Sequence, residues 1–206
     1  MYKVNDVYYS IQGEGYHTGL PVVVVRLQGC SLGCHWCDTP EAASQEDGQQ
    51  FSASQVVLMA RAAAGPVIRD ILLTGGEPTE QDLTDLVGQL CIAGFRVHLE
   101  TNGTDSGADF VIGSIHWLTI SPKQGHSVLL SYLRRASELK FIVIDRTTLD
   151  WIDKQLPIFL DYAPDDVVVS LQPEGRGHHA TELCIAKCKE TGWRLSVQVH
   201  KYLQIA

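Results

Sequence analysis

The chain has 206 residues, of which 45% are hydrophobic and 19% are charged. That composition is typical of a globular protein with a core and argues against an intrinsically disordered chain. Sixteen basic residues against 24 acidic ones give a net charge of −8, which argues against a nucleic-acid-binding protein because such proteins present a basic patch.

The N-terminal segment, residues 1–6, lacks the basic and then apolar pattern of a signal peptide. No apolar run along the chain approaches the roughly 20 residues that a transmembrane helix needs. We therefore expect a cytoplasmic protein with neither a membrane nor a nucleic acid as partner. Disulfides are uncommon in that compartment, so clustered cysteines there indicate metal binding or catalysis.

Seven runs of strand-like composition recur along the chain, and helix-like segments separate most of them. Several of these runs, such as residues 22–25, are continuously apolar, which is typical of parallel strands that helices cover on both faces. The expected strands are residues 22–27, 71–74, 96–100, 118–121, 140–144, 167–171 and 195–199.

Helix signals occupy the intervals between these runs. Ser52 and Gln55 have the spacing of a capping box ahead of an apolar run, and Gly65 with Pro66 marks where that helix ends. The other expected helices are residues 79–93, 127–136, 149–156 and 180–190.

One helix between most strands implies right-handed βαβ crossovers. We expect an α/β fold with about six or seven mostly parallel strands and helices outside them. Because a complete eight-unit barrel takes about 250 residues, this should be an incomplete, TIM-like barrel that forms a single domain over residues 1–206. Active sites of such folds lie at the C-terminal ends of the strands. Polar and glycine-rich segments follow the expected strands there, at residues 28–38, 74–78, 100–104, 121–123 and 172–175.

Three cysteines, Cys30, Cys34 and Cys37, lie within eight residues directly after the first of these strands. Thiolates are soft ligands that suit iron–sulfur clusters, zinc or Cu(I). A structural zinc site needs four ligands, and His35 could complete one. Electron-transfer [4Fe–4S] clusters also use four cysteines. Three cysteines alone leave one iron without a protein ligand, which is what a catalytic cluster needs.

Two motifs together resemble the radical S-adenosylmethionine (SAM) superfamily. The cysteine loop matches its C-x3-C-x-aromatic-C signature, with Trp36 as the aromatic residue, and residues 74–78 (Thr-Gly-Gly-Glu-Pro) match its glycine-rich motif. The resemblance implies a [4Fe–4S] cluster on the three cysteines, whose open iron is chelated by the amino and carboxylate groups of SAM. Reduction of that cluster cleaves SAM to methionine and a 5′-deoxyadenosyl radical.

Further motifs resemble the 7-carboxy-7-deazaguanine synthase family within that superfamily, in order and over nearly the whole chain. This family converts 6-carboxy-5,6,7,8-tetrahydropterin to 7-carboxy-7-deazaguanine with loss of ammonia, on the route to queuosine. The resemblance also implies a flavodoxin- or ferredoxin-type reductant, and a homodimer. The motifs that carry it are residues 9–15, 25–30, 37–39, 100–104, 121–123, 171–173 and 198–202.

The resemblance assigns roles to individual residues. Mg²⁺ would bind Thr39 beside the substrate, where a hydroxyl is a suitable hard ligand. The planar fork of Arg26 suits the substrate carboxylate. The residues implied to contact SAM are Trp36, Gly75, Gly76, Glu77, Ser121, Pro122, Lys123, Gln172, Pro173, Glu174 and Gly175. Those implied to contact the pterin are Ile11, Gln12, Gly13, Glu14, Arg26 and Thr74.

One departure and two alternatives remain open at this stage. Glu174 stands where the family pattern leads us to expect an apolar or small polar residue, so it either alters the SAM contacts or points to solvent. A radical SAM activase, which generates a glycyl radical on a partner protein, also has a short chain and the three-cysteine loop. A non-catalytic iron–sulfur electron carrier or scaffold would bind no SAM and would give the glycine-rich motif no role.

Overall fold

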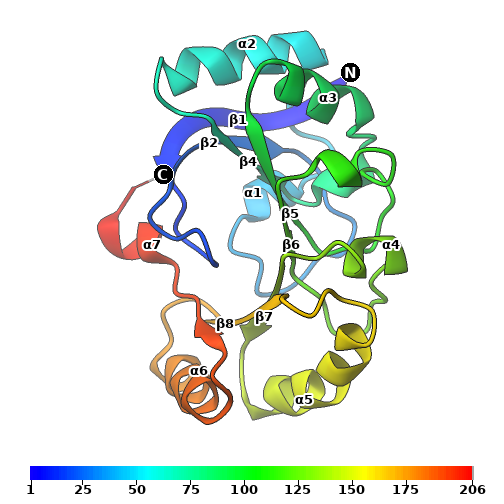
Figure 1. Ribbon diagram of the computed structural model, residues 1–206. Helices are drawn as coiled ribbons and strands as arrows, with labels where there is room; N and C mark the ends of the chain where they lie inside the picture. The colour runs from blue at the N-terminus through cyan, green and yellow to red at the C-terminus, as the bar shows by residue number, and fades with distance from the viewer. Residues whose placement is uncertain (206) are drawn as a thin grey trace.

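The structure, a computed structural model, describes residues 1–205. Within this range the strands form one curved sheet in the order β3-β1-β2-β4-β5-β6-β7-β8-β9, and Figure 1 shows helices α2 to α6 around its outer side. The strands are β1 (Tyr2–Ile11), β2 (Pro21–Leu27), β3 (Gln49–Phe51), β4 (Asp70–Gly75), β5 (Arg96–Thr101), β6 (Trp117–Ile120), β7 (Glu138–Val143), β8 (Val168–Pro173) and β9 (Arg194–Leu195). The helices are α1 (Pro40–Ala43), α2 (Ala53–Ala64), α3 (Thr84–Ile92), α4 (Leu130–Leu133), α5 (Arg146–Leu160), α6 (His178–Thr191) and α7 (Val199–Leu203), with 3₁₀ turns η1 (Pro78–Glu80) and η2 (Ile112–Ser114).

The expected parallel sheet is confirmed. Strands β2, β4, β5, β6, β7, β8 and β9 pair in parallel, each with the next. In the described part of the chain β9 does not pair with β3, so the barrel stays open, and α7 lies on the open side (Figure 1). The last expected strand, 195–199, was too long, because the chain leaves β9 after Leu195 and begins α7 at Val199.

Two antiparallel strands at the other edge were not predicted. β1 pairs with β2, and β3 pairs with β1. A register shift between Val4 and Asp6 interrupts the alternation in β1. Consequently Tyr2, Val4 and Val7 all face the core on the helix side of the sheet. A regular strand would place Val7 on the opposite face from Tyr2 and Val4. The irregular spacing concealed this strand from a pattern search.

The helices follow the expectations with two corrections, the smaller being that the expected helix 127–136 is helical only over Leu130–Leu133. Ser52 and Gln55 form both bonds of the capping box at the start of α2. The expected helix 79–93 is instead η1, a short loop and then α3. It is broken because Gly107 inserts its backbone: Gly107 N donates to Thr79 O at 3.0 Å and Leu83 N donates to Gly107 O at 2.7 Å.

The two faces of β2 separate the core from the site. Val23, Val25 and Leu27 are fully buried and pack with the helices that surround the sheet. The alternate residues Val24 and Arg26 line the concave side. This division places charged residues inside the curve of the sheet. In the part of the chain that the structure describes, no helix is long and apolar enough to cross a membrane.

Candidate active site

A cavity of about 720 Å³ lies on the concave side of the sheet. Strand ends of β2, β4, β5, β7 and β8, the loops that follow them, the end of β1 and helix α7 line it. Every residue that the sequence assigned to SAM, pterin or metal lines this cavity, with the exception of Pro122, which is buried outside its lining. The residues expected at the strand ends therefore lie together in one cavity.

The cysteine loop is fixed by hydrogen bonds to the segment around α1. Cys30 N donates to Ala43 O at 3.1 Å, and Cys37 N donates to Cys34 O at 3.0 Å. The buried side chain of Gln28 donates to the carbonyls of Glu41 and Ser44 at 2.7 and 3.0 Å. These bonds hold the loop in place, and all three thiols line the cavity.

The two glycines of the Thr-Gly-Gly-Glu-Pro motif pack directly under that loop. A Cβ on Gly75 would lie 2.4 Å from Leu27 O, and a Cβ on Gly76 would lie 2.4 Å from Gly29 O. Glu77 N also donates to Gly29 O at 2.8 Å. Backbone contact at this distance excludes every side chain, so the motif needs glycine for close approach between the loops that follow β2 and β4.

The carboxylate of Glu77 is occupied by protein donors. It accepts hydrogen bonds from Thr79 N at 3.0 Å, Thr79 Oγ1 at 2.7 Å, Thr101 Oγ1 at 2.6 Å and Asn102 N at 2.7 Å. Burial raises its pKa, and these donors oppose the rise. Glu77 thus ties the loop after β4 to the end of β5.

The donor set fits a [4Fe–4S] cluster. Cys30, Cys34 and Cys37 are free thiols, and burial raises the pKa of Cys30 and Cys34. Among residues 1–205 no three His, Cys, Asp or Glu side chains converge on one point as they would around a single metal ion. A cluster does not require such convergence, because each thiolate binds a different iron. A tetrahedral zinc site does require it.

A lysine lies beside the cysteine loop. Lys123 Nζ donates to Ser121 O at 2.6 Å and to Ser121 Oγ at 2.7 Å, and it lies 5.4 Å from the centroid of the Trp36 ring. Burial lowers the pKa of Lys123 to about 8, while the neighbouring Cys34 thiol acts in the opposite direction. Burial raises the pKa of Cys34, and the charge of Lys123 partly opposes that rise.

Arg26 and Thr74 are register neighbours on β2 and β4, and both line the cavity. Arg26 Nη2 donates to the Tyr8 hydroxyl at 3.1 Å, so β1 orients the guanidinium. Thr39 lines the cavity near the cysteine loop, and its hydroxyl donates to Asp38 Oδ1 at 3.3 Å.

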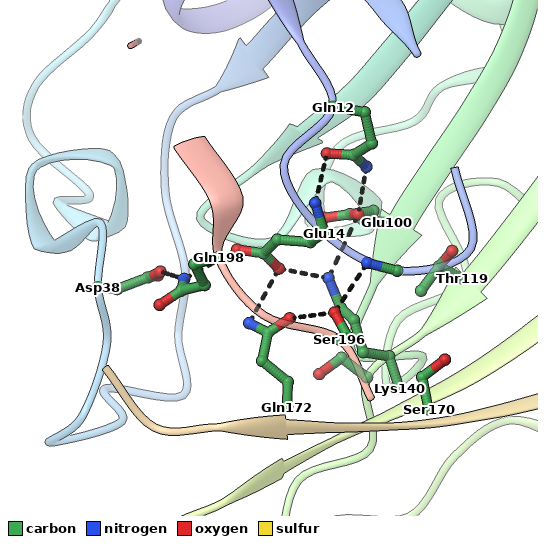
Figure 2. A network of polar contacts seen from close by, with 12 residues as sticks. Gln12, Glu14, Asp38, Glu100, Thr119, Lys140, Ser170, Gln172, Ser196 and Gln198 are labelled. Atoms are coloured by element: carbon green, nitrogen blue, oxygen red, sulfur yellow. Dashed lines mark hydrogen bonds and ion pairs between the residues drawn. The ribbon is translucent and has the colours of Figure 1, made fainter. Parts of the chain in front are cut away.

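Glu14 is the centre of a polar network in the wall of the cavity (Figure 2). Its Oε2 accepts from Lys140 Nζ at 2.6 Å and Gln172 Nε2 at 3.0 Å, and its Oε1 accepts from Gln198 Nε2 at 2.8 Å. Lys140 also lies 3.3 Å from Glu100 Oε1. Burial by itself would raise the pKa of Glu14, but Lys140 and the two amides lower it to about 2.

Several residues of this wall were not assigned a role from the sequence. Glu100 and Gln198 lie in motifs that contribute to the family resemblance, so a signal for them existed. Lys140 lies in an apolar strand, and nothing in its local sequence separates it from a surface lysine. The other cavity residues without an assigned role include Asp38, Thr101, Asn102, His200 and Lys201.

Comparisons with known proteins agree with this geometry. A family model described as the radical SAM superfamily matches residues 24–141. The 7-carboxy-7-deazaguanine synthase of Escherichia coli (strain K12) is 35% identical over 226 residues, which cover 100% of this chain and 99% of that protein. The enzyme of the same name from Bacteroides thetaiotaomicron is 34% identical over 206 residues, with 100% and 99% covered. The crystal structure of QueE from Escherichia coli matches with a TM-score of 0.77 at 32% identity, covering 97% of this chain and 94% of that one.

Proposed function

The chain belongs to the 7-carboxy-7-deazaguanine synthase family of the radical SAM superfamily, and we propose that its cavity converts 6-carboxy-5,6,7,8-tetrahydropterin to 7-carboxy-7-deazaguanine with loss of ammonia. The chain is an enzyme that acts on a small molecule and uses a [4Fe–4S] cluster with SAM. One observation carries the substrate assignment: a single cavity brings the three thiols and the glycine motif together with Arg26 and Glu14. The activase and electron-carrier alternatives have no use for those last two residues.

We assign the cluster to Cys30, Cys34 and Cys37. When bound, the cluster and SAM together supply the radical chemistry. The protein holds the reactants in place and excludes water from them. Lys123 contributes a positive charge beside the thiolates. The residues that we propose to contact SAM are Trp36, Gly75, the backbone of Gly76 and Glu77, Ser121, Lys123, Gln172, Pro173, Glu174 and Gly175, all in the cavity lining. Pro122 shapes the turn between Ser121 and Lys123 from outside the lining.

The pterin lies between the ends of β1, β2 and β4 in this proposal. Arg26 takes the substrate carboxylate with two parallel N–H groups, since Tyr8 already orients its guanidinium. Glu14 accepts hydrogen bonds from N–H groups of the pterin ring, because the network around it keeps the carboxylate ionised. Ile11, Gln12, Gly13 and Thr74 complete the binding surface.

We place Mg²⁺ at Thr39, where the hydroxyl lies in the cavity and the Asp38 carboxylate adjoins it. Mg²⁺ retains waters and binds few protein ligands when the substrate supplies oxygens. The prediction is that Thr39→Ala raises the Mg²⁺ concentration that half-maximal turnover needs. An unchanged Mg²⁺ dependence of turnover would show that the ion binds at other residues.

The wider setting is also part of the proposal. We propose a single radical SAM domain over residues 1–206 that works as a cytoplasmic homodimer in queuosine biosynthesis. A flavodoxin or ferredoxin supplies the electron. Sedimentation of the anaerobically purified protein tests the dimer, and reduction of the cluster by each purified carrier tests the reductant.

The deciding experiment is an anaerobic assay of the reconstituted enzyme with dithionite, SAM, Mg²⁺ and 6-carboxytetrahydropterin, followed by mass spectrometry. We expect many turnovers of 7-carboxy-7-deazaguanine, abolished in Cys34→Ala and retained in Cys91→Ala, a cysteine of α3 outside the cavity lining. Cleavage of SAM without this product would overturn the substrate assignment and leave the radical SAM chemistry. Neither cleavage nor product, with an intact cluster, would favour an electron carrier.

A further inference from the structure

A single buried lysine, Lys140, lies among the carboxylates of one wall of the cavity. The side chain of Lys140 is only 4% exposed, and its ammonium contacts Glu14 at 2.6 Å and Glu100 at 3.3 Å. A third carboxylate, Glu138, lies near enough for its charge to raise the pKa of Lys140, along with those of Glu100 and Glu14, although burial acts against this rise. Three carboxylates around one ammonium make a wall of net negative charge.

The carboxylate of Glu138 receives its hydrogen bonds from residues other than Lys140. Ser170 Oγ donates to its Oε1 at 2.5 Å, and Tyr16 N, Thr119 Oγ1 and the Trp117 indole donate to its Oε2 at 3.1, 3.3 and 3.4 Å. No hydrogen bond joins Glu138 and Lys140 in the described structure. The ammonium is therefore engaged with the two carboxylates that face the cavity.

Lys140 and its neighbours leave acceptor capacity on both of those carboxylates. A carboxylate offers about four acceptor positions. Three are used on Glu14, by Lys140, Gln172 and Gln198. On Glu100, which lines the cavity, Lys140 and Gln12 both donate to Oε1, and neither contact uses Oε2. The orientation of each carboxylate is thus fixed by protein donors, and at least one position on each stays available to a ligand.

We propose that Lys140 is a positioning residue of the pterin site: its ammonium orients the carboxylates of Glu14 and Glu100, so that both accept hydrogen bonds from N–H groups of the substrate ring. This inference rests on the proposed function. The pyrimidine part of a tetrahydropterin carries several N–H donors along one edge. A unit of two carboxylates and one ammonium has a net charge of −1, which is complementary to such an edge. Lys140 acts through the carboxylates and touches no reacting atom.

The test is pterin binding, measured apart from turnover. The cluster-loaded enzyme with SAM but without reductant is dialysed against 6-carboxytetrahydropterin between about pH 5 and 8. Lys140→Met should weaken pterin binding by about 10- to 100-fold, and most at the acid end, because Glu14 loses its strongest neutralising partner and takes up a proton there. The wild type should show no such acid limb from Glu14, whose pKa is held at about 2. SAM binding should be unchanged.

The comparison of Lys140→Met with the wild type leaves the other charged and titratable groups around Glu14 unchanged. They come from β5, from β7, from the loop after the cysteines, from the turn after β6 and from α7. These groups are Glu100, Glu138, Asp38, Lys123, His200 and Lys201. A second background, Glu14→Gln, separates the effect of Lys140 from theirs. In that background Lys140→Met should weaken pterin binding less than it does in the wild type, because only its contact with Glu100 remains to be lost.

A matched control is Lys187→Met. Lys187 is 15% exposed and lies 2.9 Å from Asp153, so it also loses an ion pair, but it is on α6 outside the cavity lining. Its pterin affinity and pH profile should equal those of the wild type. Should Lys140→Met fail to fold, Lys140→Gln keeps N–H donors to both carboxylates without the charge, and the same acid limb is expected.

Two results would overturn the inference. One is a folded Lys140→Met or Lys140→Gln variant that binds the pterin with wild-type affinity and a flat pH profile. The other is an equal loss in the Glu14→Gln background, which would make Lys140 a structural residue. Failure of the wild type to bind the pterin is a different outcome, because it contradicts the proposed function itself.

Discussion

Replacing Gly76 by alanine tests whether the glycine motif exists to seat the cysteine loop. The added Cβ would lie 2.4 Å from Gly29 O and 2.6 Å from Ala42 O. Both contacts are with backbone atoms, which cannot swing aside as a long side chain could. Since carbon and oxygen atoms require more than 3 Å, the two loops must separate, and the cysteines move with Gly29.

We expect two consequences of different size. Overpacking of this kind costs about 1–3 kcal/mol, which for a chain of this length lowers the apo-protein Tm by roughly 2–12 °C. Cluster incorporation should suffer more, because its three ligands are on the displaced loop. Iron and sulfide content after anaerobic reconstitution, measured without SAM, should fall well below wild type. Differential scanning calorimetry of the apo-protein measures the first effect.

Gly88→Ala is the control for a glycine without a packing role. Gly88 lies within α3, and a Cβ there would meet no atom within 4 Å. Alanine in a helix interior stabilises by about 0.5–1 kcal/mol relative to glycine, so this variant should melt higher and load its cluster fully. A Gly76→Ala variant with normal iron content and normal Tm would refute the reasoning, because it would show that the loops move apart without cost.

Three further predictions concern other parts of the chain. Arg26→Lys should raise KM for the pterin about ten-fold or more, because an ammonium cannot form the two parallel bonds of a guanidinium; unchanged steady-state kinetics would contradict the carboxylate assignment. Ser52→Ala should lower the free energy of unfolding by about 1 kcal/mol through loss of a helix cap, and urea denaturation with an unchanged midpoint would contradict this. Asp70→Asn should cost about 1–2 kcal/mol at neutral pH. Burial opposes ionisation of Asp70, yet Arg96 and His98 lower its pKa. Stability from a lowered carboxyl pKa is present above the unfolded-state pKa and lost as pH falls through the folded-state pKa, so the advantage of the wild type should disappear in acid. A difference in the free energy of unfolding between the wild type and Asp70→Asn that persists in acid would show that the lowered pKa of Asp70 is not its cause.

The parallel part of the fold was accessible from the sequence because its strands are buried on both faces. Continuous apolar runs such as 22–25 identify such strands directly. β1 was inaccessible because the register shift after Val4 changes which face each residue occupies. The end of the chain was misassigned for a different reason: Ser196 Oγ donates to Gln172 Oε1 and Gln198 donates to Glu14, so tertiary contacts override the local strand pattern.

The site divides in the same way. The cysteines form one short motif and the glycines another, so their resemblance to the radical SAM signatures is visible in the sequence, and the structure places both in one cavity. Lys140 meets Glu14 across 126 positions of the chain and Glu100 across 40. Contacts of that separation have no local signature, and a lysine in an apolar strand is recognisable as part of a site only after folding brings its partners to it.

Glu14 and Glu77 show why residue type and local sequence are not enough to predict what a side chain binds. Each glutamate follows a glycine in a motif that the sequence assigns to ligand binding. Folding gives Glu77 four hydrogen bonds from Thr79, Thr101 and Asn102, which use its acceptor positions within the protein, and burial raises its pKa. Glu14 receives three hydrogen bonds and the charge of a buried lysine, which keeps it ionised with a position to spare. The number and charge of the donors that surround each carboxylate therefore determine how much hydrogen-bonding capacity it keeps for the ligand that we propose.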